Sequence, residues 1–103
     1  MKIIFHQSVE KFIKCLDPNS ASEMLRMVEL LEIYGHSLSM PHTKPIGDGL
    51  LELRVVSKRP LRILYGFCNG KAVLVIALKK QRRALLLRDV KIAKRRLDKY
   101  CTS

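Results

Sequence analysis

The sequence predicts a small α+β protein in which an N-terminal strand and a helix pair pack on a mainly antiparallel twisted sheet, with a helix at the C-terminal end. Two observations predict this class. Apolar residues recur with helical spacing near both ends of the chain, whereas the middle holds three strand-like runs, two of them joined by an Asn-Gly turn. With 48% hydrophobic residues the chain can bury a core, and its 103 residues leave room for one domain over residues 1–103.

A short strand over residues 2–6 and a helix from about Ser8 begin the chain. The helix is indicated by apolar residues that recur on one face, namely Val9, Phe12, Ile13 and Leu16. Pro18 is expected to end it, because proline disrupts a helix interior.

A second helix is predicted from Ser20, because Ser20 and Glu23 have the spacing of a capping box. Its apolar residues are Met24, Met27, Val28 and Leu31, and Gly35 offers a C-terminal stop. The two helices should therefore form an antiparallel pair.

The remaining elements follow an irregular loop over residues 36–49, which holds two prolines and two glycines. Three strands are predicted over residues 50–56, 61–67 and 72–79. A final helix is predicted over about residues 86–100, with apolar residues on one side and basic residues on the others.

The Asn69-Gly70 pair aligns the last two strands. It favours a two-residue type I′ turn, so residues directly opposite each other should have numbers that sum to 139, as 69 and 70 do. Opposite residues share a face of the sheet, and this register places Arg62 and Lys79 on one face.

Glu52 and Arg54 are expected on that same face. Leu51, Leu53 and Val55 form the apolar side of their strand, so the residues between them point the other way. The shared face with Arg62 requires an odd or bulged connection around residues 57–60. An ordinary surface ion pair of Glu52 is the simpler alternative, but one carboxylate cannot neutralise three cations.

Positive charge is concentrated in the second half of the chain. Residues 1–53 hold five basic and seven acidic side chains, a net charge of −2, whereas residues 54–103 hold fifteen basic and two acidic ones, a net charge of +13. Such a field favours a polyanionic partner, and RNA is favoured over a membrane, because no apolar run approaches the ~20 residues of a spanning helix. The apolar N-terminal stretch is too short for a signal peptide, so we expect a cytoplasmic protein.

The cysteines and histidines show no ligand spacing. Cys15, Cys68 and Cys101 are far apart and odd in number, so we expect reduced thiols rather than disulfides or zinc ligands. The three histidines likewise lack partners at metal-binding spacing. We therefore expect no metal and no other cofactor.

An ordered series of short motifs resembles a known family. The series consists of Pro-His-Thr-Lys-Pro-Ile-Gly-Asp-Gly-Leu-Leu-Glu-Leu-Arg over residues 41–54, Arg62-Ile63-Leu64-Tyr65, Lys79-Lys80 and a basic helix that ends in Tyr100. In this order and spacing it is similar to the RelE/HigB superfamily of toxin endoribonucleases, in its phage-derived Gp49-like branch. The resemblance extends over most of the chain.

The resemblance implies a RelE-like fold and the toxin of a type II toxin-antitoxin system. Such a toxin binds the ribosome next to ribosomal RNA and cleaves mRNA in the A site by 2′-hydroxyl attack, which inhibits translation. A cognate antitoxin, often with a helix-turn-helix domain, neutralises it, and operator DNA is contacted only through that antitoxin. The resemblance further implies that the active-site cations are Arg54, Arg62, Lys79 and Lys80.

Cleavage of RNA without a metal needs groups that take a proton, stabilise a dianionic phosphorane and return a proton. Arg54 and Arg62 suit the charge role, because their planar donors grip two phosphate oxygens. Lys79 or Lys80 is assigned as the base. Glu52 is either a rival base or a residue that only orients Arg54.

Further side chains are expected to contact RNA. The cations Arg82, Arg83, Lys94, Arg95 and Arg96 should follow the phosphate backbone, with a solvated basic helix as the simpler alternative. His42 could act as an acid or stack on a base, and Tyr100 could stack on a base, although solvation and packing explain them more simply.

Two departures from the family pattern leave other functions open. Family members commonly have an aromatic residue two positions before the Lys-Lys pair and a Thr-x-Lys-Thr-Pro-like run after it, whereas this chain has Ala77 and the run over residues 81–85. The alternative is a non-catalytic RNA- or DNA-binding protein derived from the toxin fold. An adaptor that uses its charge only to dock a partner is a third hypothesis.

Overall fold

A computed structural model describes residues 1–81 and 83–101. Its elements, in chain order, are β1 (Lys2–Phe5), α1 (Gln7–Lys14), α2 (Pro18–Tyr34), the short 3-10 turn η1 (Gly35–Ser37), β2 (Thr43–Gly47), β3 (Leu50–Val55), β4 (Leu61–Cys68), β5 (Lys71–Lys79) and α3 (Leu87–Cys101). The α+β class is confirmed.

The five strands form one sheet in the order β1-β5-β4-β3-β2. Only β1 and β5 pair in parallel, and the other neighbours pair antiparallel, as expected of strands joined by short turns. The mainly antiparallel sheet is therefore confirmed. The order makes β1 and β2 the two edge strands.

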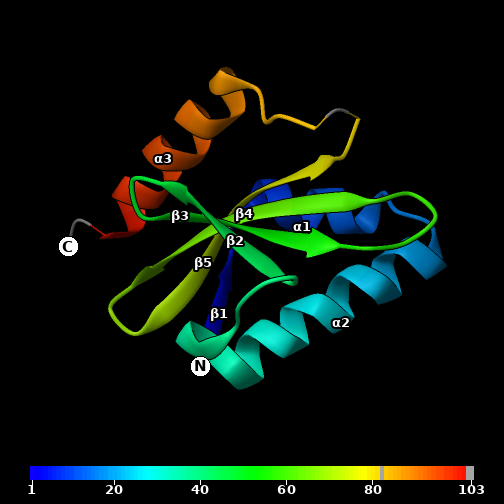
Figure 1. Cartoon of the computed structure of the whole chain (residues 1–103), viewed down its shortest axis with the longest axis horizontal. Coiled ribbons are helices and arrows are strands. Elements are labelled where there is room, and N and C mark those ends of the chain that lie inside the picture. Colours follow the sequence, from blue (N-terminus) through cyan, green and yellow to red (C-terminus); the bar gives the residue numbers. More distant parts are fainter. Residues whose placement is uncertain (82, 102–103) are drawn as a thin grey trace.

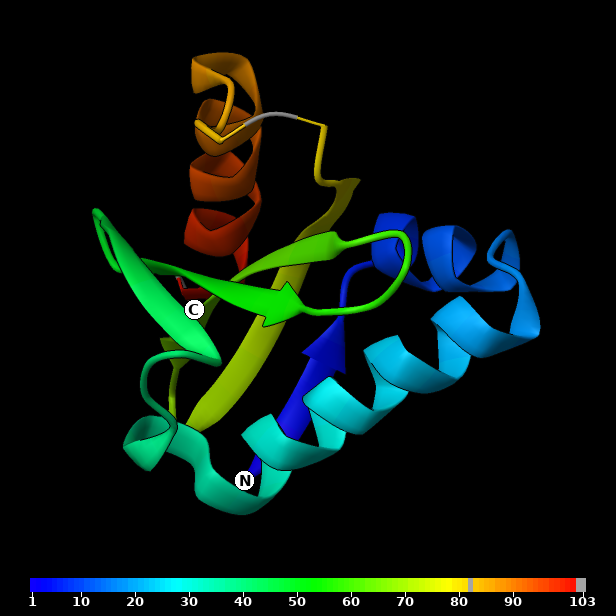
Figure 2. The same cartoon turned by 45° about the vertical axis from the view of Figure 1, so that its right-hand side comes forward.

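Helices cover both faces of the sheet, with α1 and α2 on one face and α3 on the other (Figures 1 and 2). Each face has its own apolar core. The first core joins α1 and α2 to sheet residues that include Leu53, Ile63 and Tyr65. The second joins Ala93 and Leu97 of α3 to sheet residues that include Leu64, Val73 and Val75.

Gly66 of β4 lets α3 lie close to the sheet. A Cβ atom at this position would overlap with Leu97 of α3 and would lie 2.9 Å from the carbonyl oxygen of Gly49. The absence of a side chain there lets Leu97 pack directly over β4, which fixes the helix against the second core.

Residues 36–49 were expected to form an irregular loop, and this prediction is wrong for part of the segment, because β2 (Thr43–Gly47) lies within it. An edge strand needs hydrogen bonds on one side only, so it tolerates Pro45. Gly47 has a φ of +102° where the pairing with β3 shifts at a bulge. The prolines and glycines that suggested a loop therefore belong to a kinked edge strand.

The second helix begins two residues earlier than expected. Asp17, rather than Ser20, is the N-cap, and its carboxylate accepts a hydrogen bond from the Ser20 backbone N–H at 3.2 Å. The hydrogen bonds from Ser20 lower the pKa of the Asp17 carboxyl. Pro18 occupies the first turn of α2, where a missing N–H costs nothing, so it starts this helix and does not end α1.

The Asn69-Gly70 turn is confirmed, since both residues have the positive φ values, 53° and 74°, that a type I′ turn requires. The expected register holds from Cys68 opposite Lys71 to Tyr65 opposite Leu74. It then shifts by one residue at a β-bulge, and the next pair is Leu64 opposite Ile76. Beyond the bulge, opposite residues have numbers that sum to 140.

This bulge overturns one prediction about the candidate site. Lys79 lies opposite Leu61, which packs in the core under α1 and α2, whereas Arg62 lies opposite Leu78. Lys79 therefore does not share the face of the sheet that carries Arg62, because a one-residue shift moves every following side chain to the other face.

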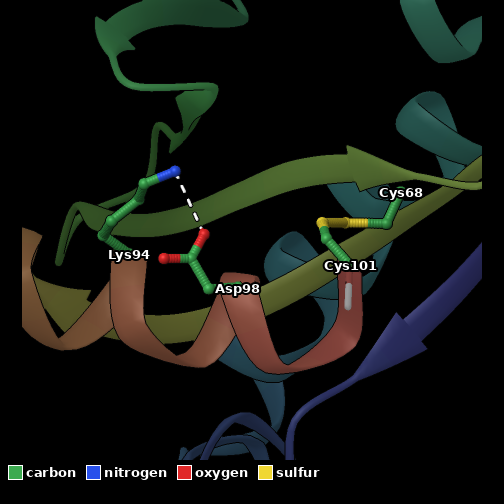
Figure 3. The surroundings of a disulfide bond; sticks show 4 residues. All are labelled: Cys68, Lys94, Asp98 and Cys101. Carbon is green, nitrogen blue, oxygen red and sulfur yellow. Dashed lines mark ion pairs between the residues drawn. A yellow bond between two sulfur atoms is a disulfide. The ribbon is translucent and has the colours of Figure 1, made fainter. Parts of the chain in front are cut away.

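Cys68 and Cys101 form a disulfide, which links the β4–β5 turn to the end of α3 (Figure 3). The expectation of reduced thiols is wrong for this pair, and Cys15 is free and exposed. Their 33-residue separation gives no hint of contact, but packing of α3 on the sheet brings their Cα atoms to 5.3 Å, a normal distance for a disulfide.

Within residues 1–81 and 83–101, no helix has the length and apolar character needed to cross a lipid bilayer.

Candidate functional site

Two arginines and a carboxylate meet where β3 pairs with β4. Arg54 lies directly opposite Arg62, and Glu52 lies opposite Leu64 on the same face. The expectation that Glu52 and Arg54 share the face of Arg62 is therefore confirmed. The connection between Val55 and Leu61 has an odd number of residues, as that arrangement requires.

Glu52 lies between the two guanidinium groups. Arg54 Nε donates to Glu52 Oε1 at 3.2 Å, and Arg62 Nε lies 3.6 Å from Glu52 Oε2. The side chains of Glu52 and Arg62 are only 7% and 6% exposed, whereas that of Arg54 is 36% exposed. Two cations opposite each other repel, and the shared carboxylate offsets part of that repulsion. Its two oxygens hold the arginines side by side.

Arg62 also fixes the chain that follows β5. Its Nη2 atom donates a hydrogen bond of 2.6 Å to the carbonyl oxygen of Arg83. A charged donor makes such a hydrogen bond stronger than a neutral one. Arg62 therefore ties the segment before α3 to the floor of the sheet.

A cavity of about 470 Å³ lies over this pair of arginines. Its described lining is strongly cationic, with one carboxylate among five basic residues. The lining residues are Lys44, Pro45, Ile46, Glu52, Arg54, Arg62, Lys80, Arg83, Ala84 and Leu85. Below, the term arginine cavity refers to this space.

The two lysines of the Lys79-Lys80 pair differ in whether they line the arginine cavity. Lys80 lines the arginine cavity, and its backbone N–H donates to the Pro60 carbonyl at 2.9 Å, which extends the sheet pairing beyond β5. Lys79 lines a neighbouring cavity of about 360 Å³, which shares Arg62 with the first. The structure thus brings Glu52, Arg54, Arg62 and Lys80 together and leaves Lys79 beside them.

Thr43 and Tyr65 form a buried support beneath Glu52. The Thr43 hydroxyl donates to the Glu52 carbonyl at 3.1 Å and lies 2.6 Å from the Tyr65 hydroxyl. Burial raises the pKa of Tyr65, and the hydrogen bond with Thr43 opposes part of that rise. This pair fixes the backbone of β3 where it presents its carboxylate to the arginines.

Thr43 and Lys44 were not predicted to be site residues. Both lie in the segment that was expected to be a loop, where side-chain directions cannot be assigned. A strand over Thr43–Gly47 would have sent Thr43 and Lys44 to opposite faces. The run Thr-Lys-Pro-Ile does not alternate between apolar and polar residues, so no strand pattern in the sequence marked them.

Other residues expected to contact RNA lie at varied distances from this site. Arg83 lines the arginine cavity, whereas Arg82 lies outside the described residues. His42 is exposed and is not part of the cavity lining, although its carbonyl accepts the backbone N–H of Arg54 at 2.9 Å. His42 therefore contacts β3 through its backbone and does not line the arginine cavity.

Four of the expected RNA-binding residues belong to α3. Lys94 forms an ion pair with Asp98 at 3.1 Å, so part of its charge is neutralised (Figure 3). Arg95, Arg96 and Tyr100 line another cavity of about 600 Å³, which among the described residues shares no lining residue with the arginine cavity. The basic helix therefore does not extend the arginine cavity directly.

The arginine cavity has the chemistry of a site for a phosphate group. Guanidinium groups present parallel N–H donors that match two oxygens of one phosphate, and a partly enclosed site strengthens such contacts relative to bulk water. Arg54 is the more exposed of the two arginines, whereas Arg62 is buried and contacts Glu52. Arg54 is therefore the accessible donor, and Arg62 is the rigid one.

Comparison with known proteins identified one family. The family described as phage derived protein Gp49-like (DUF891) matches residues 11–98. No curated protein matched the chain closely enough to count as a relative. The matched range contains every residue that lines the arginine cavity.

Proposed function

The chain belongs to the Gp49-like family of phage-derived proteins, a branch of the RelE/HigB-like toxin group, and from that membership we propose that it is an endoribonuclease toxin that cleaves mRNA on the ribosome. The observation that carries this proposal is the pair of arginines that Glu52 holds over a cationic cavity. A toxin of this group has a cognate antitoxin as its partner. We further propose that this antitoxin carries a helix-turn-helix domain and is the only contact with operator DNA.

The proposed reaction is an internal transfer at one phosphodiester. The 2′-oxygen of the upstream ribose forms a bond to phosphorus, and the bond from phosphorus to the 5′-oxygen of the next nucleotide breaks. The products are a 2′,3′-cyclic phosphate and a 5′-hydroxyl. One proton leaves the 2′-hydroxyl and one reaches the departing oxygen, so the protein needs to supply proton transfer and charge stabilisation only.

Arg54 and Arg62 are assigned to the phosphorane. Negative charge grows on its non-bridging oxygens as the new bond forms, and donors already fixed in place stabilise that charge without a cost of reorganisation. Arg62 is the fixed donor, since Glu52 and the Arg83 carbonyl hold it from two sides. Arg54 is exposed enough to meet the substrate first.

Lys80 is assigned to proton transfer, because it is the lysine of the pair that lines the arginine cavity. Glu52 is assigned as a positioning residue rather than as the base. Each of its oxygens already faces an arginine, at 3.2 Å and 3.6 Å, so a proton acceptor role would compete with those contacts. Lys44 and Arg83 then contact flanking phosphates.

We expect Lys80→Ala to lower the rate of mRNA cleavage by about 100-fold or more, which is the usual effect of removing a general acid or base. Lys79→Ala is the matched control, because it removes the adjacent lysine from the neighbouring cavity, and its loss should be less than about tenfold. The measurement is the rate of cleavage of mRNA bound to purified ribosomes. Equal losses for the two variants would show that the assignment of Lys80 is wrong.

The experiment that tests the function is expression of the chain in growing cells, with mRNA 5′ ends mapped on translating ribosomes. We expect arrested growth and new ends within coding regions. A non-catalytic RNA- or DNA-binding protein is the second candidate, favoured by Ala77 and the altered run over residues 81–85. That protein would produce no new ends, although it would still bind RNA.

A further inference from the structure

A second cationic cavity lies between α3 and the end of β1. Its volume is about 600 Å³, and over residues 1–81 and 83–101 it shares no lining residue with the arginine cavity. The lining residues are His6, Ile92, Arg95, Arg96, Lys99 and Tyr100. Below, the term α3 cavity refers to this space. The mechanism proposed above does not use it.

Arg96 is anchored by neutral acceptors. Its Nη1 atom donates to the Ser8 hydroxyl at 2.8 Å and to the Val75 carbonyl at 2.9 Å. These contacts fix the direction of the guanidinium group but do not neutralise it. The half-buried guanidinium therefore presents a fixed positive charge at the wall of the α3 cavity.

His6 adds a hydrogen-bond donor to the same wall. Its Nδ1 atom accepts the backbone N–H of Ser8 at 3.0 Å, so the neutral ring carries its proton on Nε2. Burial lowers the pKa of His6, and the charges of Arg96 and Lys99 lower it further. The imidazole thus experiences the positive field of the cavity.

No ion pair neutralises these cations within residues 1–81 and 83–101. Over that part of the chain, neither Arg95, Arg96 nor Lys99 forms an ion pair, and the nearby ion pair of α3 joins Lys94 to Asp98 instead. Like charges gathered over a concave surface repel each other, and a bound anion offsets that repulsion.

An aromatic wall accompanies the cations. Tyr100 is 37% exposed and lines the cavity together with Ile92, so an aromatic ring and an aliphatic side chain lie among the cations. Proteins that bind single-stranded RNA combine these two features, because bases stack on aromatic rings while cations contact the phosphates. Inorganic phosphate alone would leave the Tyr100 ring without a partner to stack on it.

We propose that the α3 cavity binds a nucleoside phosphate, with its phosphate on Arg95, Arg96 and Lys99 and its base against Tyr100. The ligand is either one unit of an RNA strand or a free mononucleotide, since both present the same groups. This proposal rests on the proposed function in one respect, because the choice of RNA as the main ligand comes from that function. It does not require cleavage, because the two cavities are separate.

The first test follows the imidazole signals of His6 by NMR in the full chain. We expect them to shift when a short single-stranded RNA is added, and to shift in the Arg62→Ala variant as well. A shift with adenosine monophosphate would identify a mononucleotide site, and a shift with the oligonucleotide alone would identify a strand site. The absence of a shift with either ligand at saturation would overturn the proposal.

The second test compares two variants of equal net charge. Arg95→Glu with Lys99→Glu reverses two charges in the cavity, whereas Lys91→Glu with Lys14→Glu reverses two exposed charges outside it. By fluorescence anisotropy, we expect the first variant to bind the oligonucleotide at least about tenfold more weakly than the second. Equal affinities would show that RNA is held by overall charge and not by this cavity.

Failure here can be distinguished from failure of the proposed function. If mRNA is cleaved on ribosomes but the His6 signals do not shift with either ligand, the function proposed for the arginine cavity is retained. The proposal for the α3 cavity is then wrong. If His6 responds but no mRNA is cleaved, the chain is a binding protein and the site proposed here remains.

Discussion

Arg62→Ala is expected to lower the rate of mRNA cleavage on the ribosome by a factor of about 10² to 10³, the usual cost of removing one donor that stabilises a transition-state oxyanion. Arg62 supplies the most rigid donor of the site, since its side chain is 6% exposed and is held by Glu52 and by the Arg83 carbonyl. Its loss also frees the segment that closes one side of the arginine cavity. Cleavage of mRNA on purified ribosomes measures the effect.

The matched control is Arg26→Ala, which removes an exposed arginine of α2. Arg26 forms an ion pair with Glu23 and does not belong to the candidate site. That variant should keep its full rate. Because Arg62 is buried, its replacement can unfold the protein. We therefore also test Arg62→Gln and record thermal unfolding of both variants, which identifies a folded but inactive protein. If both Arg62 variants are folded and cleave mRNA at the normal rate, the charge role assigned to Arg62 is wrong.

Reduction of the Cys68–Cys101 disulfide is expected to lower the free energy of unfolding by about 3 to 4 kcal/mol, the chain-entropy estimate for a closed loop of its 33-residue separation. The bond joins the end of α3 to the turn between β4 and β5, so the reduced chain gains freedom chiefly when it unfolds. Urea unfolding with and without a reductant measures the difference.

Cys101→Ser should show the same loss in the absence of reductant, whereas Cys15→Ser should show none, because Cys15 is exposed and free. The Cys15→Ser variant also prevents exchange with a third thiol during the measurement. An unfolding midpoint that is the same with and without reductant would contradict the prediction.

Local sequence signals were sufficient for most of the fold. The Asn69-Gly70 turn was predictable because two consecutive residues with positive φ strongly favour asparagine and glycine. Gly35 ended its helix as expected, with a φ of 53°. In each case the residue type itself favours the backbone conformation it adopts, so no tertiary information was needed.

Features that depend on packing between distant segments were not predictable. No Gly or Pro marks the bulge between β4 and β5 in the sequence. Because of this bulge, Lys79 and Arg62 lie on opposite faces of the sheet. The contact between Cys68 and Cys101 depends on how α3 lies across the sheet. β2 was missed because Pro45 is acceptable only at an edge, and the strand order was not known.

For the candidate site, sequence reasoning correctly placed Glu52, Arg54 and Arg62 on one face, because alternation along β3 needs only the apolar pattern of its neighbours. It did not reveal that Arg62 binds the Arg83 carbonyl, or that Thr43 and Tyr65 support the backbone beneath Glu52. Hydrogen bonds between segments that lie far apart in the sequence produce no repeating pattern of residue types, so they cannot be predicted from such patterns.

The most direct test of the central claim replaces one hydroxyl in the substrate. Purified protein is mixed with ribosomes that carry one of two mRNAs in the A site. The first is a normal mRNA, and the second has a single 2′-deoxy nucleotide on the upstream side of the cleavage position. We expect the normal mRNA to yield 2′,3′-cyclic phosphate and 5′-hydroxyl ends, and the deoxy mRNA to stay intact. Cleavage of the deoxy mRNA, or an intact normal mRNA, would contradict the central claim.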